Sequence, residues 1–344
     1  MSSVKDKRNF IIIAIQNLTE EIGEILKGSF DLSYFSGRAS VLMMILFATV
    51  VSCRPGGSRE LNETPTRGDI RIMADESFEL LVDTEVKTFT SLYQNAKIKV
   101  DYKPEVDLIN DFMKDSAKVI VTSRRLTEDQ IQYLRDTLVV ARTTSFAWDA
   151  LALISNKDNK DTLLRYTTVR DIFKGRTKNW KDINPNSDRN EISVIFDNTK
   201  SGNIRYFKEL FEIEGSLEEN FFAVNSNSEV VDFVSRNPDA LGIISVNWIS
   251  DKDDSLSMSF IDKVNIIAVS QELYDGNFYR PYQGFIYDKS YPFVREILFI
   301  SRETFAGLGT GFIQFATAEQ GQRIVLKSGL VPAMMPIRLV QIKQ

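Results

Sequence analysis

Two kinds of hydrophobic pattern alternate along the chain from residue 69 onward. Short runs of apolar, often β-branched residues are typical of buried strands, whereas apolar positions three or four residues apart are typical of helices. The strand-like runs are IRIMA (70–74), KIKVDY (97–102), KVIVT (118–122), ALALIS (150–155) and ISVIF (192–196). The helical stretches are 77–93, the segment after Thr127, 203–211, and the segments near 292–305 and 311–328. Strands that alternate with helices predict an α/β fold with largely parallel sheets.

A separate apolar run lies near the beginning of the chain. Residues 41–51 (VLMMILFATVV) are too few to span a bilayer, which takes about 20 residues, but they suit the core of a secretory signal. The run leads into Val50-Val51-Ser52-Cys53, which resembles a bacterial lipobox, where the cysteine is lipidated and becomes the mature N-terminus. We therefore predict lipidation at Cys53. The alternative is a buried helix that carries an ordinary core cysteine.

This prediction divides the first part of the chain into a leader over 1–52 and a flexible tether over 53–68. Residues 1–35 include a helical stretch of mixed charge, so either translation starts further downstream or the leader is unusually long. Residues 54–68 (RPGGSRELNETPTRG) are polar and contain Gly and Pro, which is typical of a linker. A lipid anchor would hold the folded part at a membrane surface without a transmembrane helix.

The composition excludes several classes of chemistry. The 344 residues contain no histidine and one cysteine, which excludes Ser-His-Asp and Cys-His catalysis, zinc sites built on imidazole and an internal disulfide. The formal net charge of −5 disfavours a general nucleic-acid surface. We expect no metal, no cofactor and no nucleic-acid partner.

Two strand-to-helix turns share one arrangement. The strand at 70–74 leads into a helix that begins at Ser77 and Phe78, and the strand at 192–196 leads into a helix that begins at Ser201, Gly202 and Asn203. A helix N-terminus offers unpaired backbone N–H groups and the positive end of the helix dipole. In parallel α/β sheets such turns lie at the carboxyl ends of strands, where ligands bind. Each turn alone is more commonly an ordinary serine cap, but the two together indicate an anion-binding cleft.

Two further patterns carry weaker signals. The turn Thr122-Ser123-Arg124-Arg125 follows the strand at 118–122, and its guanidinium groups either pair with an oxyanion or form a solvated basic turn. The stretch GLGTG (307–311) lacks the spacing of a nucleotide-binding loop and a strand before it, so we expect it at the entry to a helix.

Three segments together resemble the phosphate-binding (PstS-like) proteins of bacterial ABC importers. TTVRDIFKGRTKNWKDIN (167–184) is similar to that family's Ile-Phe-x-Gly and Asn-Trp motif, and FDNTKSGNIRYF (196–207) to its Ser-Gly-Thr loop and the helix after it. GLGTGFIQFATAEQGQRIVLKSGLVPA (307–333) is similar to the C-terminal segment that ends in Gly-Leu-Val-Pro. With shorter similarities between them, the resemblance covers about 69–335.

The resemblance implies a type II periplasmic-binding fold, in which two α/β lobes are joined by two hinge crossings and hold a ligand between them. The crossings are expected near 145–151 and 279–285, so that 69–147 with 284–344 forms lobe I and 148–283 forms lobe II. The positions that match the family's anion-binding residues are Ser77, Phe78, Ser201, Gly202 and Asn203. Asn203 stands where the family usually has threonine.

The charged residues depart from the family's pattern. Asp197 stands where the family has an arginine, Arg124 stands where it has a carboxylate, and 103–105 replace its Gly-Ser-Gly loop. One hypothesis is a reciprocal exchange, in which Arg124, next to Ser123, faces the anion and Asp197 accepts the proton of a hydrogen phosphate. The rival hypothesis is that phosphate binding is lost and another ligand is bound.

These features predict a lipid-anchored solute-binding protein of the cell envelope that faces the periplasm. We expect a monomer without enzymatic activity that captures inorganic phosphate, or a similar oxyanion, and passes it to an ABC permease. The alternative is a surface sensor or adhesion module that kept the fold but altered or lost the ligand. A phosphate-ester hydrolase is disfavoured because, without histidine, it would need a carboxylate cluster that holds a metal.

Overall fold

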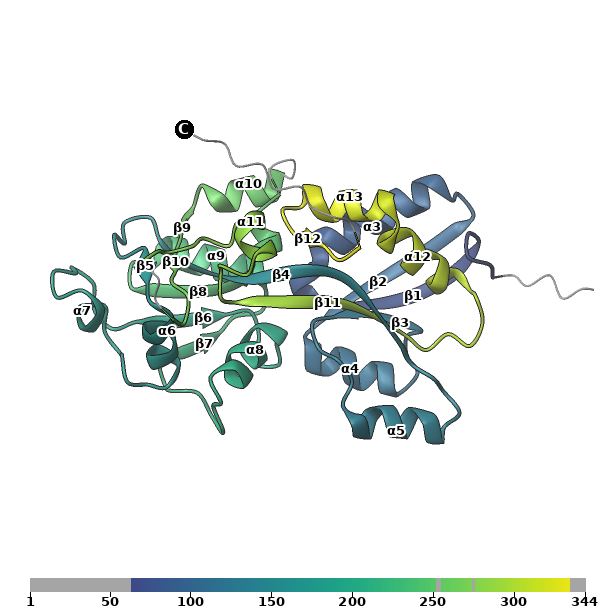
Figure 1. Cartoon of the computed structure of the whole chain (residues 1–344), viewed down its shortest axis with the longest axis horizontal. Coiled ribbons are helices and arrows are strands. Elements are labelled where there is room, and N and C mark those ends of the chain that lie inside the picture. The colour runs from purple at the N-terminus through teal and green to yellow at the C-terminus, as the bar shows by residue number, and fades with distance from the viewer. Residues whose placement is uncertain (1–62, 252–254, 274–275, 335–344) are drawn as a thin grey trace, which may run out of the picture. The chain divides into compact units, whose positions relative to one another are not determined.

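The computed structural model describes residues 63–251, 255–273 and 276–334 (Figure 1). They belong to one compact unit that spans Asn62–Gln344. The predicted leader, the lipidation site at Cys53 and most of the predicted tether lie outside the described residues. Residues 63–67 belong to the folded unit, where the Thr64 N–H donates to the Arg67 carbonyl at 2.7 Å. Among the helices that the structure describes, none is long and apolar enough to cross a membrane.

One half of the sheet is built around parallel strands and closed by an antiparallel pair. β1 pairs in parallel with β2 on one side and β3 on the other, and β11 then runs antiparallel to both β3 and β4. These strands, together with β12 on the far side of β4, form the sheet of lobe I. Their bounds are β1 (Gly68–Asp75), β2 (Ala96–Lys103), β3 (Val119–Thr122), β4 (Arg142–Asn156), β11 (Val294–Ser301) and β12 (Val331–Pro332).

The long strand β4 continues from this half into a second one. Its residues 142–150 pair with β11, and its residues 151–155 pair with β8. β8, β6 and β7 lie side by side in parallel, β9 pairs with the end of β4, and β5 with β10 forms a small separate sheet. These strands form lobe II. Their bounds are β5 (Leu163–Leu164), β6 (Ser193–Phe196), β7 (Phe221–Ala223), β8 (Ala240–Ser245), β9 (Val264–Ile266) and β10 (Ala268–Val269).

Helices cover the sheets of both lobes. In lobe I they are η1 (Glu76–Phe78), α3 (Glu79–Leu92), α4 (Glu105–Met113), α5 (Glu128–Asp136), α12 (Leu308–Thr317) and α13 (Glu319–Lys327). In lobe II they are α6 (Tyr166–Phe173), α7 (Trp180–Ile183), α8 (Gly202–Leu210), α9 (Asn227–Arg236), η2 (Val246–Trp248), α10 (Ser255–Ile261) and α11 (Gln283–Tyr287). The α/β fold with two lobes is confirmed, whereas the lobe boundaries at 147/148 and 283/284 stay a prediction.

Local signals in the sequence explain several of these elements. The Thr127 hydroxyl accepts from the Gln130 N–H at 3.3 Å while the Gln130 side chain accepts from the Thr127 N–H at 3.0 Å, a capping box that starts α5. Gly175, just after α6, has a φ of 70°, which glycine adopts without strain.

Two helix predictions near the C-terminus were wrong. Residues 292–305, predicted as a helix, contain strand β11, whose last four residues are all buried. A strand that is buried on both faces has a nearly continuous apolar run, and such a run cannot be told from a buried helix by periodicity. The single helix predicted at 311–328 is two helices, because Ala318 between α12 and α13 has an extended backbone (φ −81°, ψ 175°).

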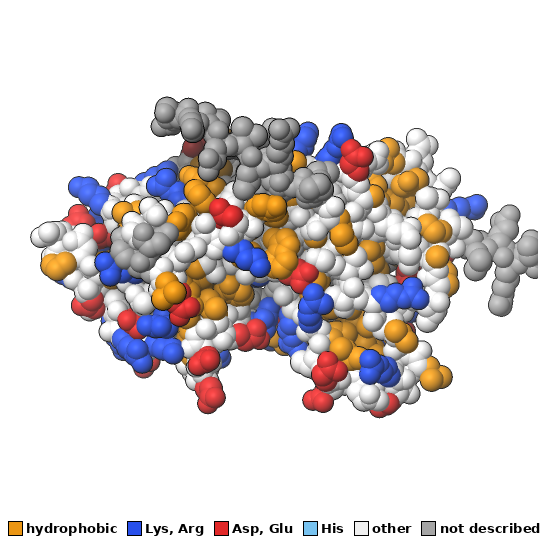
Figure 2. All heavy atoms as spheres, viewed as in Figure 1, with side chains coloured by type: hydrophobic (Ala, Val, Ile, Leu, Met, Phe, Trp, Pro, Cys, Tyr) orange, Lys and Arg blue, Asp and Glu red, His pale blue; other side chains and the backbone are white. Residues whose placement is uncertain are grey.

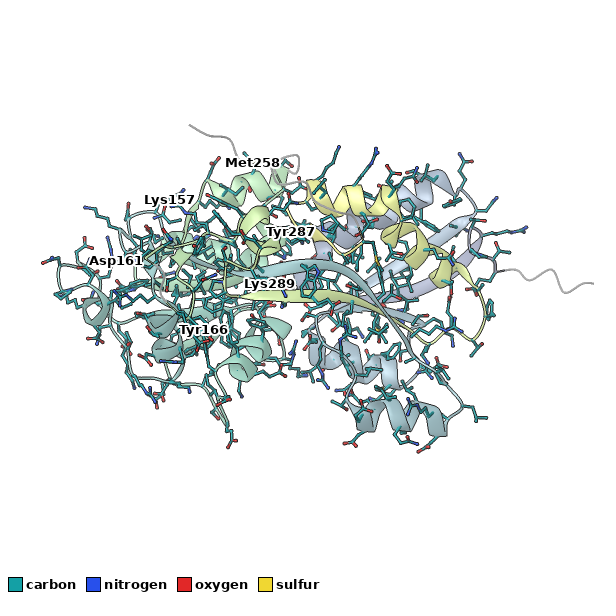
Figure 3. All side chains as sticks on the ribbon, viewed as in Figure 1. Lys157, Asp161, Tyr166, Met258, Tyr287 and Lys289 are labelled. Atoms are coloured by element: carbon teal, nitrogen blue, oxygen red, sulfur yellow. The ribbon has the colours of Figure 1, made fainter. Side chains whose placement is uncertain are left out.

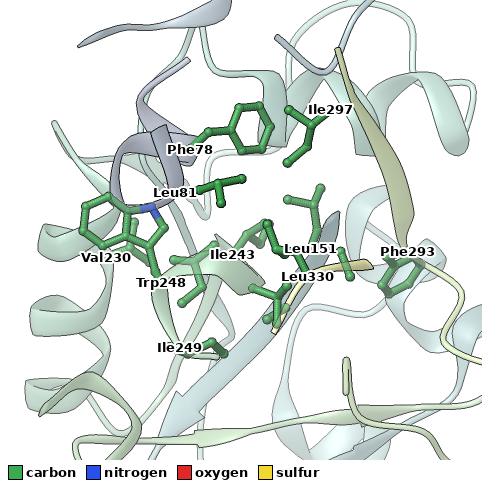
Figure 4. Close-up of a cluster of buried hydrophobic side chains, with 14 of the residues drawn as sticks. Phe78, Leu81, Leu151, Val230, Ile243, Trp248, Ile249, Phe293, Ile297 and Leu330 are labelled. Carbon is green, nitrogen blue, oxygen red and sulfur yellow. The ribbon is translucent and has the colours of Figure 1, made fainter. Parts of the chain in front are cut away.

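One hydrophobic cluster continues from lobe I into lobe II through the shared strand (Figure 4). Phe78 and Leu81 from one lobe and Ile243 and Trp248 from the other are all buried in it, together with Leu151 of β4. A second, smaller cluster lies beneath α4 and α5. The packing of Phe78 into the larger cluster fixes the position of the turn that precedes α3.

The surface carries charges of both signs. Figure 2 shows acidic and basic side chains interspersed over the face that it presents. Lys289, labelled in Figure 3 beside β4 and β11, has its Nζ 5.4 Å from the ring centroid of the half-buried Trp148. The charged groups that matter for the site below are instead buried.

Candidate functional site between the lobes

The two strand-to-helix turns predicted from the sequence meet in the structure. At the end of β1, the Asp75 carboxylate accepts a hydrogen bond from the Ser77 N–H at 2.9 Å. At the start of α8, the Ser201 hydroxyl accepts from the Asn203 N–H, also at 2.9 Å. The Ser77 hydroxyl then donates to Asn203 Oδ1 at 3.2 Å, across the two lobes. The fold therefore brings Ser77, Ser201 and Asn203 together, while their role in ligand binding stays a prediction.

Asp197 organises the turn in lobe II. Its Oδ1 accepts from the Ser201 hydroxyl at 2.6 Å and from Asn203 Nδ2 at 3.0 Å, and its Oδ2 accepts from Asn227 Nδ2 at 3.4 Å. Asp197 is buried, and burial raises the pKa of its carboxyl, opposed by the hydrogen bond from Ser201. The carboxylate thus sets the orientation of the hydroxyl and the amide at the N-terminus of α8.

Gly202 lets two carboxylates from lobe I come close to the backbone of α8. A Cβ at this position would lie 2.9 Å from Asp75 Oδ2, 2.9 Å from Glu105 Oε2 and 3.1 Å from Ser123 Oγ. The Ser123 hydroxyl also donates to Glu105 Oε2 at 3.0 Å. A side chain at 202 would therefore have to displace the ends of these side chains, and Ser123 belongs to the same group of residues.

A buried ion pair lies beside these turns. Arg295 on β11 faces Asp149 on β4, and its Nε donates to Asp149 Oδ2 at 2.8 Å, while the Ser245 hydroxyl donates to Asp149 Oδ1 at 2.9 Å. The Arg295 side chain is 3% exposed. Its two terminal nitrogens have no hydrogen-bond partner among the described residues. The guanidinium carbon lies 4.9 Å from the ring centroid of Phe78. Arg295 thus has two buried donor groups that the described residues leave unused.

The acids of the site are shifted toward their protonated forms. Burial, reinforced by the charge of Glu105 and opposed by that of Arg295, raises the pKa of Asp75 to about 7. Burial, followed by the charges of Asp197 and Asp75, raises the pKa of Glu76 to about 8. Arg295 reduces the electrostatic repulsion at Asp75 without removing it, so the site holds protons at neutral pH.

Direct contacts hold the lobes against each other. The Arg205 guanidinium of α8 pairs with the buried Glu105 carboxylate of α4, with NH2 at 3.1 Å from Oε2. Lys200 Nζ donates to Asp107 Oδ1 at 2.9 Å, and the Val106 N–H donates to the Lys200 carbonyl at 3.2 Å. The structure is therefore that of a closed interface.

Arg124 lies at the rim of this interface. Its NH2 donates to Gln130 Oε1 at 3.3 Å, and its backbone N–H donates to the Thr122 hydroxyl at 3.2 Å. With Ser201 and Arg205 it lines a surface pocket of about 520 Å³. The predicted exchange, in which Arg124 faces the anion, stays a prediction, and Arg295 is the arginine whose charge acts on Asp75 and Asp197.

Four residues of the site belong to none of the predicted binding positions: Arg295, Asp149, Glu105 and Asn227. Two of them carry a signal that could have been used, because Asp149 interrupts the apolar run FAWDALALI and Arg295 interrupts FVREILFI. Charged residues in buried strands are rare unless they are paired. The two interruptions could therefore have been matched to each other.

The stretch GLGTG begins helix α12, as expected for a helix entry. The Glu303 carboxylate accepts from the Gly309 N–H at 2.9 Å and from the Thr310 N–H at 2.6 Å, and Glu63 accepts from the Leu308 N–H at 3.1 Å. These acids occupy the N-terminus of α12. Over the described ranges, no group of three or more Cys, Asp or Glu side chains is placed to hold a metal ion.

The comparison with protein families decides the class of this fold. A family model described as a PBP superfamily domain matches residues 61–320. The chain belongs to the PBP superfamily domain family. The resemblance inferred from the three motifs is therefore confirmed.

Curated relatives and solved structures agree with this assignment. The chain is 24% identical to the phosphate-binding protein PstS of Borreliella burgdorferi over 261 residues, which cover 73% of this chain and 85% of the relative. It is 20% identical to PstS of Staphylococcus aureus over 274 residues, which cover 78% of this chain and 79% of that one.

The fold is similar to an ABC-type phosphate transport receptor from Vibrio cholerae, with a TM-score of 0.59 and 22% identity over 77% of this chain and 100% of that chain. A substrate-binding protein from Clostridium perfringens, solved with bound phosphate, gives a TM-score of 0.66 and 23% identity over the same shares. At these identities the two structures support the fold alone.

Proposed function

We propose that this chain is an extracytoplasmic solute-binding protein that binds inorganic phosphate between its lobes and passes it to an ABC permease. The observation that carries the proposal is that the two buried terminal nitrogens of Arg295 have no hydrogen-bond partner among the described residues. Arg295 lies beside Phe78, near the turns at Ser77 and Ser201. An unpaired buried donor is costly. Oxyanions pair readily with the fork of a guanidinium group.

The surrounding residues suit a hydrogen phosphate. The turns at Ser77 and Ser201 bring helix N-termini and hydroxyl groups to the anion. Asp197 gives a carboxylate that can accept a hydrogen bond from a phosphate hydroxyl, as the exchange hypothesis requires. The names of the curated relatives, which are phosphate-binding proteins, support the same ligand.

Those relatives are binding proteins rather than enzymes. We propose that this chain likewise holds its ligand by hydrogen bonds and charge, with no covalent step. Closing of the lobes around the anion would present one shape of the protein to the permease, as hinge closure does in two-lobed binding proteins.

Cys53 would anchor the protein to the membrane at the cell envelope. To test the anchor, the wild type and Cys53→Ser are expressed in a bacterial host. The cells are then fractionated, and the intact mass of the recovered chains is measured. We expect the wild type in the membrane fraction with a lipid-modified N-terminal cysteine, and the variant without lipid. A mature chain that retains Met1 would contradict the proposed anchor.

A thermal-shift screen of the purified full chain tests the ligand. We expect phosphate to raise the melting temperature in a concentration-dependent way, because a ligand that binds only the native state stabilises it by mass action. Sulfate at equal ionic strength is the control for general salt effects. An equal response to both anions would contradict selective phosphate binding. No response to any oxyanion would favour a sensor or adhesion module.

A further inference from the structure

The Asp75 carboxyl group has one oxygen that the structure leaves unused. Oδ1 accepts from the Ser77 N–H, but Oδ2 is buried and receives no hydrogen bond from the described residues. Oδ2 and Glu105 Oε2 approach the same point beside Gly202, each 2.9 Å from the position of a Cβ there. Two carboxylates at one buried point repel each other unless one of them carries a proton.

None of the nearby cations that the structure describes forms an ion pair with Asp75, although the charge of Arg295 lowers the pKa of Asp75. Arg205 pairs with Glu105, and Arg295 uses its Nε for Asp149. Lys103, the neighbour of Asp75 on β2, turns its ammonium group to Asp111.

The other charged groups that act on Asp75 and its neighbour Glu76 are acids. Asp197, just after β6, raises the pKa of Asp75 through its charge. Glu76 follows Asp75 in the chain, and the charges of Asp197 and Asp75 raise its pKa in turn. Glu105 is paired and Asp197 accepts hydrogen bonds from Ser201 and Asn203. Of the three acids Asp75, Glu105 and Asp197, Asp75 is therefore the one that has no ion-pair partner and keeps a buried oxygen without a hydrogen bond from the described residues.

We propose, on the basis of the phosphate-binding function above, that Asp75 takes up a proton from solvent when the lobes close and donates its Oδ2–H as a hydrogen bond inside the site, so that phosphate and a proton are bound together. The one bond that forms is the O–H bond of the Asp75 carboxyl, its proton comes from solvent, and the bonds of the anion do not change. In the open form, water solvates the carboxylate and the proton is released.

This coupling gives the affinity a defined pH dependence. In the closed form, burial and the neighbouring acids raise the pKa of Asp75 to about 7, whereas a solvated aspartate titrates near its ordinary value of about 4. Closing therefore requires proton uptake from about pH 5 upward, and the protonated form is lost as the pH rises past the closed-state pKa. Because one proton is bound with each phosphate, the affinity for phosphate falls by at most a factor of about ten for each unit that the pH rises.

Calorimetry of the full chain with phosphate at pH 6 tests the proposal, because this pH lies between the open-state and the closed-state pKa of Asp75. Titrations in two buffers with different enthalpies of ionisation give the number of protons taken up for each phosphate bound. We expect a value close to one for the wild type. Asp75→Asn, whose Nδ2 donates without a bound proton, should take up about one proton fewer and should bind phosphate more tightly than the wild type at pH 6. The matched control is Glu85→Gln, which removes a different buried carboxyl from α3 and should keep the wild-type uptake.

The outcomes separate the two proposals. Proton uptake that persists in Asp75→Asn would place the proton on the ligand and overturn the inference, as would phosphate binding by the wild type without uptake. Absence of phosphate binding at every pH would overturn the proposed function and this inference with it. If Asp75→Asn fails to fold, the affinity of the wild type for sulfate is measured over a series of pH values instead, because sulfate does not titrate in this range. Any sulfate binding by the wild type should weaken between pH 5 and pH 7, and a constant affinity over that range would overturn the inference.

Discussion

Replacing Glu85 by glutamine should stabilise the fold, and by much more at pH 8 than at pH 5. Glu85 lies on the buried face of α3 with no exposed surface, and neither of its carboxyl oxygens has a hydrogen-bond partner among the described residues. Burial alone raises the pKa of Glu85 to about 9. The folded protein therefore holds this residue as a neutral acid across the physiological range.

The cost of that neutral acid follows from the difference between the folded and unfolded chains. At pH 8 the unfolded chain carries Glu85 ionised, and folding must take up a proton against a pH well above the ordinary pKa of 4.5. At ~1.4 kcal/mol for each pH unit, this uptake costs about 5 kcal/mol at pH 8 and under about 1 kcal/mol at pH 5. Glutamine has nearly the same shape and needs no proton. The glutamine amide would also be buried without hydrogen-bond partners among the described residues, which offsets part of this difference. We therefore expect the free energy of unfolding to rise by about 3–5 kcal/mol at pH 8.

Urea unfolding followed by circular dichroism at pH 5 and pH 8 measures this difference. We expect Glu85→Gln to move the unfolding midpoint upward at pH 8 and to leave it nearly unchanged at pH 5. Glu214→Gln, a change at an exposed loop position, is the control and should follow the wild type at both values. Equal midpoints for wild type and Glu85→Gln at pH 8, or a gain of the same size at both pH values, would refute the reasoning.

Three further predictions concern the interface between the lobes. Gly202→Ala places a Cβ against Asp75 and Glu105. Phosphate affinity, measured by calorimetry, should therefore fall at least ~10-fold, while the free energy of unfolding stays within about 1 kcal/mol of the wild type. Unchanged affinity would contradict the close approach. Arg205→Gln leaves the buried Glu105 without its cation, a loss of about 3–5 kcal/mol that opening of the lobes can relieve. Small-angle scattering should then show a larger radius of gyration than for Lys208→Gln, and equal values would argue against the pair as a lobe contact. Arg124→Ala should lower phosphate affinity less than a change at Arg295, because its guanidinium contacts Gln130; an equal or larger loss would support the exchange hypothesis instead.

Sequence patterns were sufficient for most of the fold and for both turns of the site. The sequence predicts β1, β3 and β6 because each is short, apolar and followed by a polar turn. It predicts β2 because apolar and polar residues alternate there, and α8 because Ser201 marks its start. It does not predict β11, because the run of buried residues in β11 fits a helix and a strand equally well. Only its pairing with β3 and β4 identifies it as a strand.

The charges of the site depend on register and on long-range contacts. Arg295 meets Asp149 because the antiparallel register of β11 and β4 places them opposite each other. Arg205 reaches Glu105 across the contact between the lobes, at a separation of 100 residues. Neither contact leaves a local pattern in the sequence. A motif can therefore locate the helix N-termini but not the arginine that faces them.

The central claim is that phosphate binds to the terminal nitrogens of Arg295, which have no hydrogen-bond partner in the described part of the chain. Calorimetry of phosphate binding to the wild type and to Asp149→Asn/Arg295→Gln, in which the buried pair is replaced by neutral residues, tests it most directly. The matched control is Arg302→Gln, because Arg302 is also a buried arginine beside a phenylalanine ring, but its NH1 donates to the Phe112 carbonyl at 2.6 Å. We predict a loss of at least ~100-fold in affinity for the double variant, equivalent to ~3 kcal/mol, and wild-type affinity for the control. A folded double variant that binds phosphate as tightly as the wild type would contradict the claim.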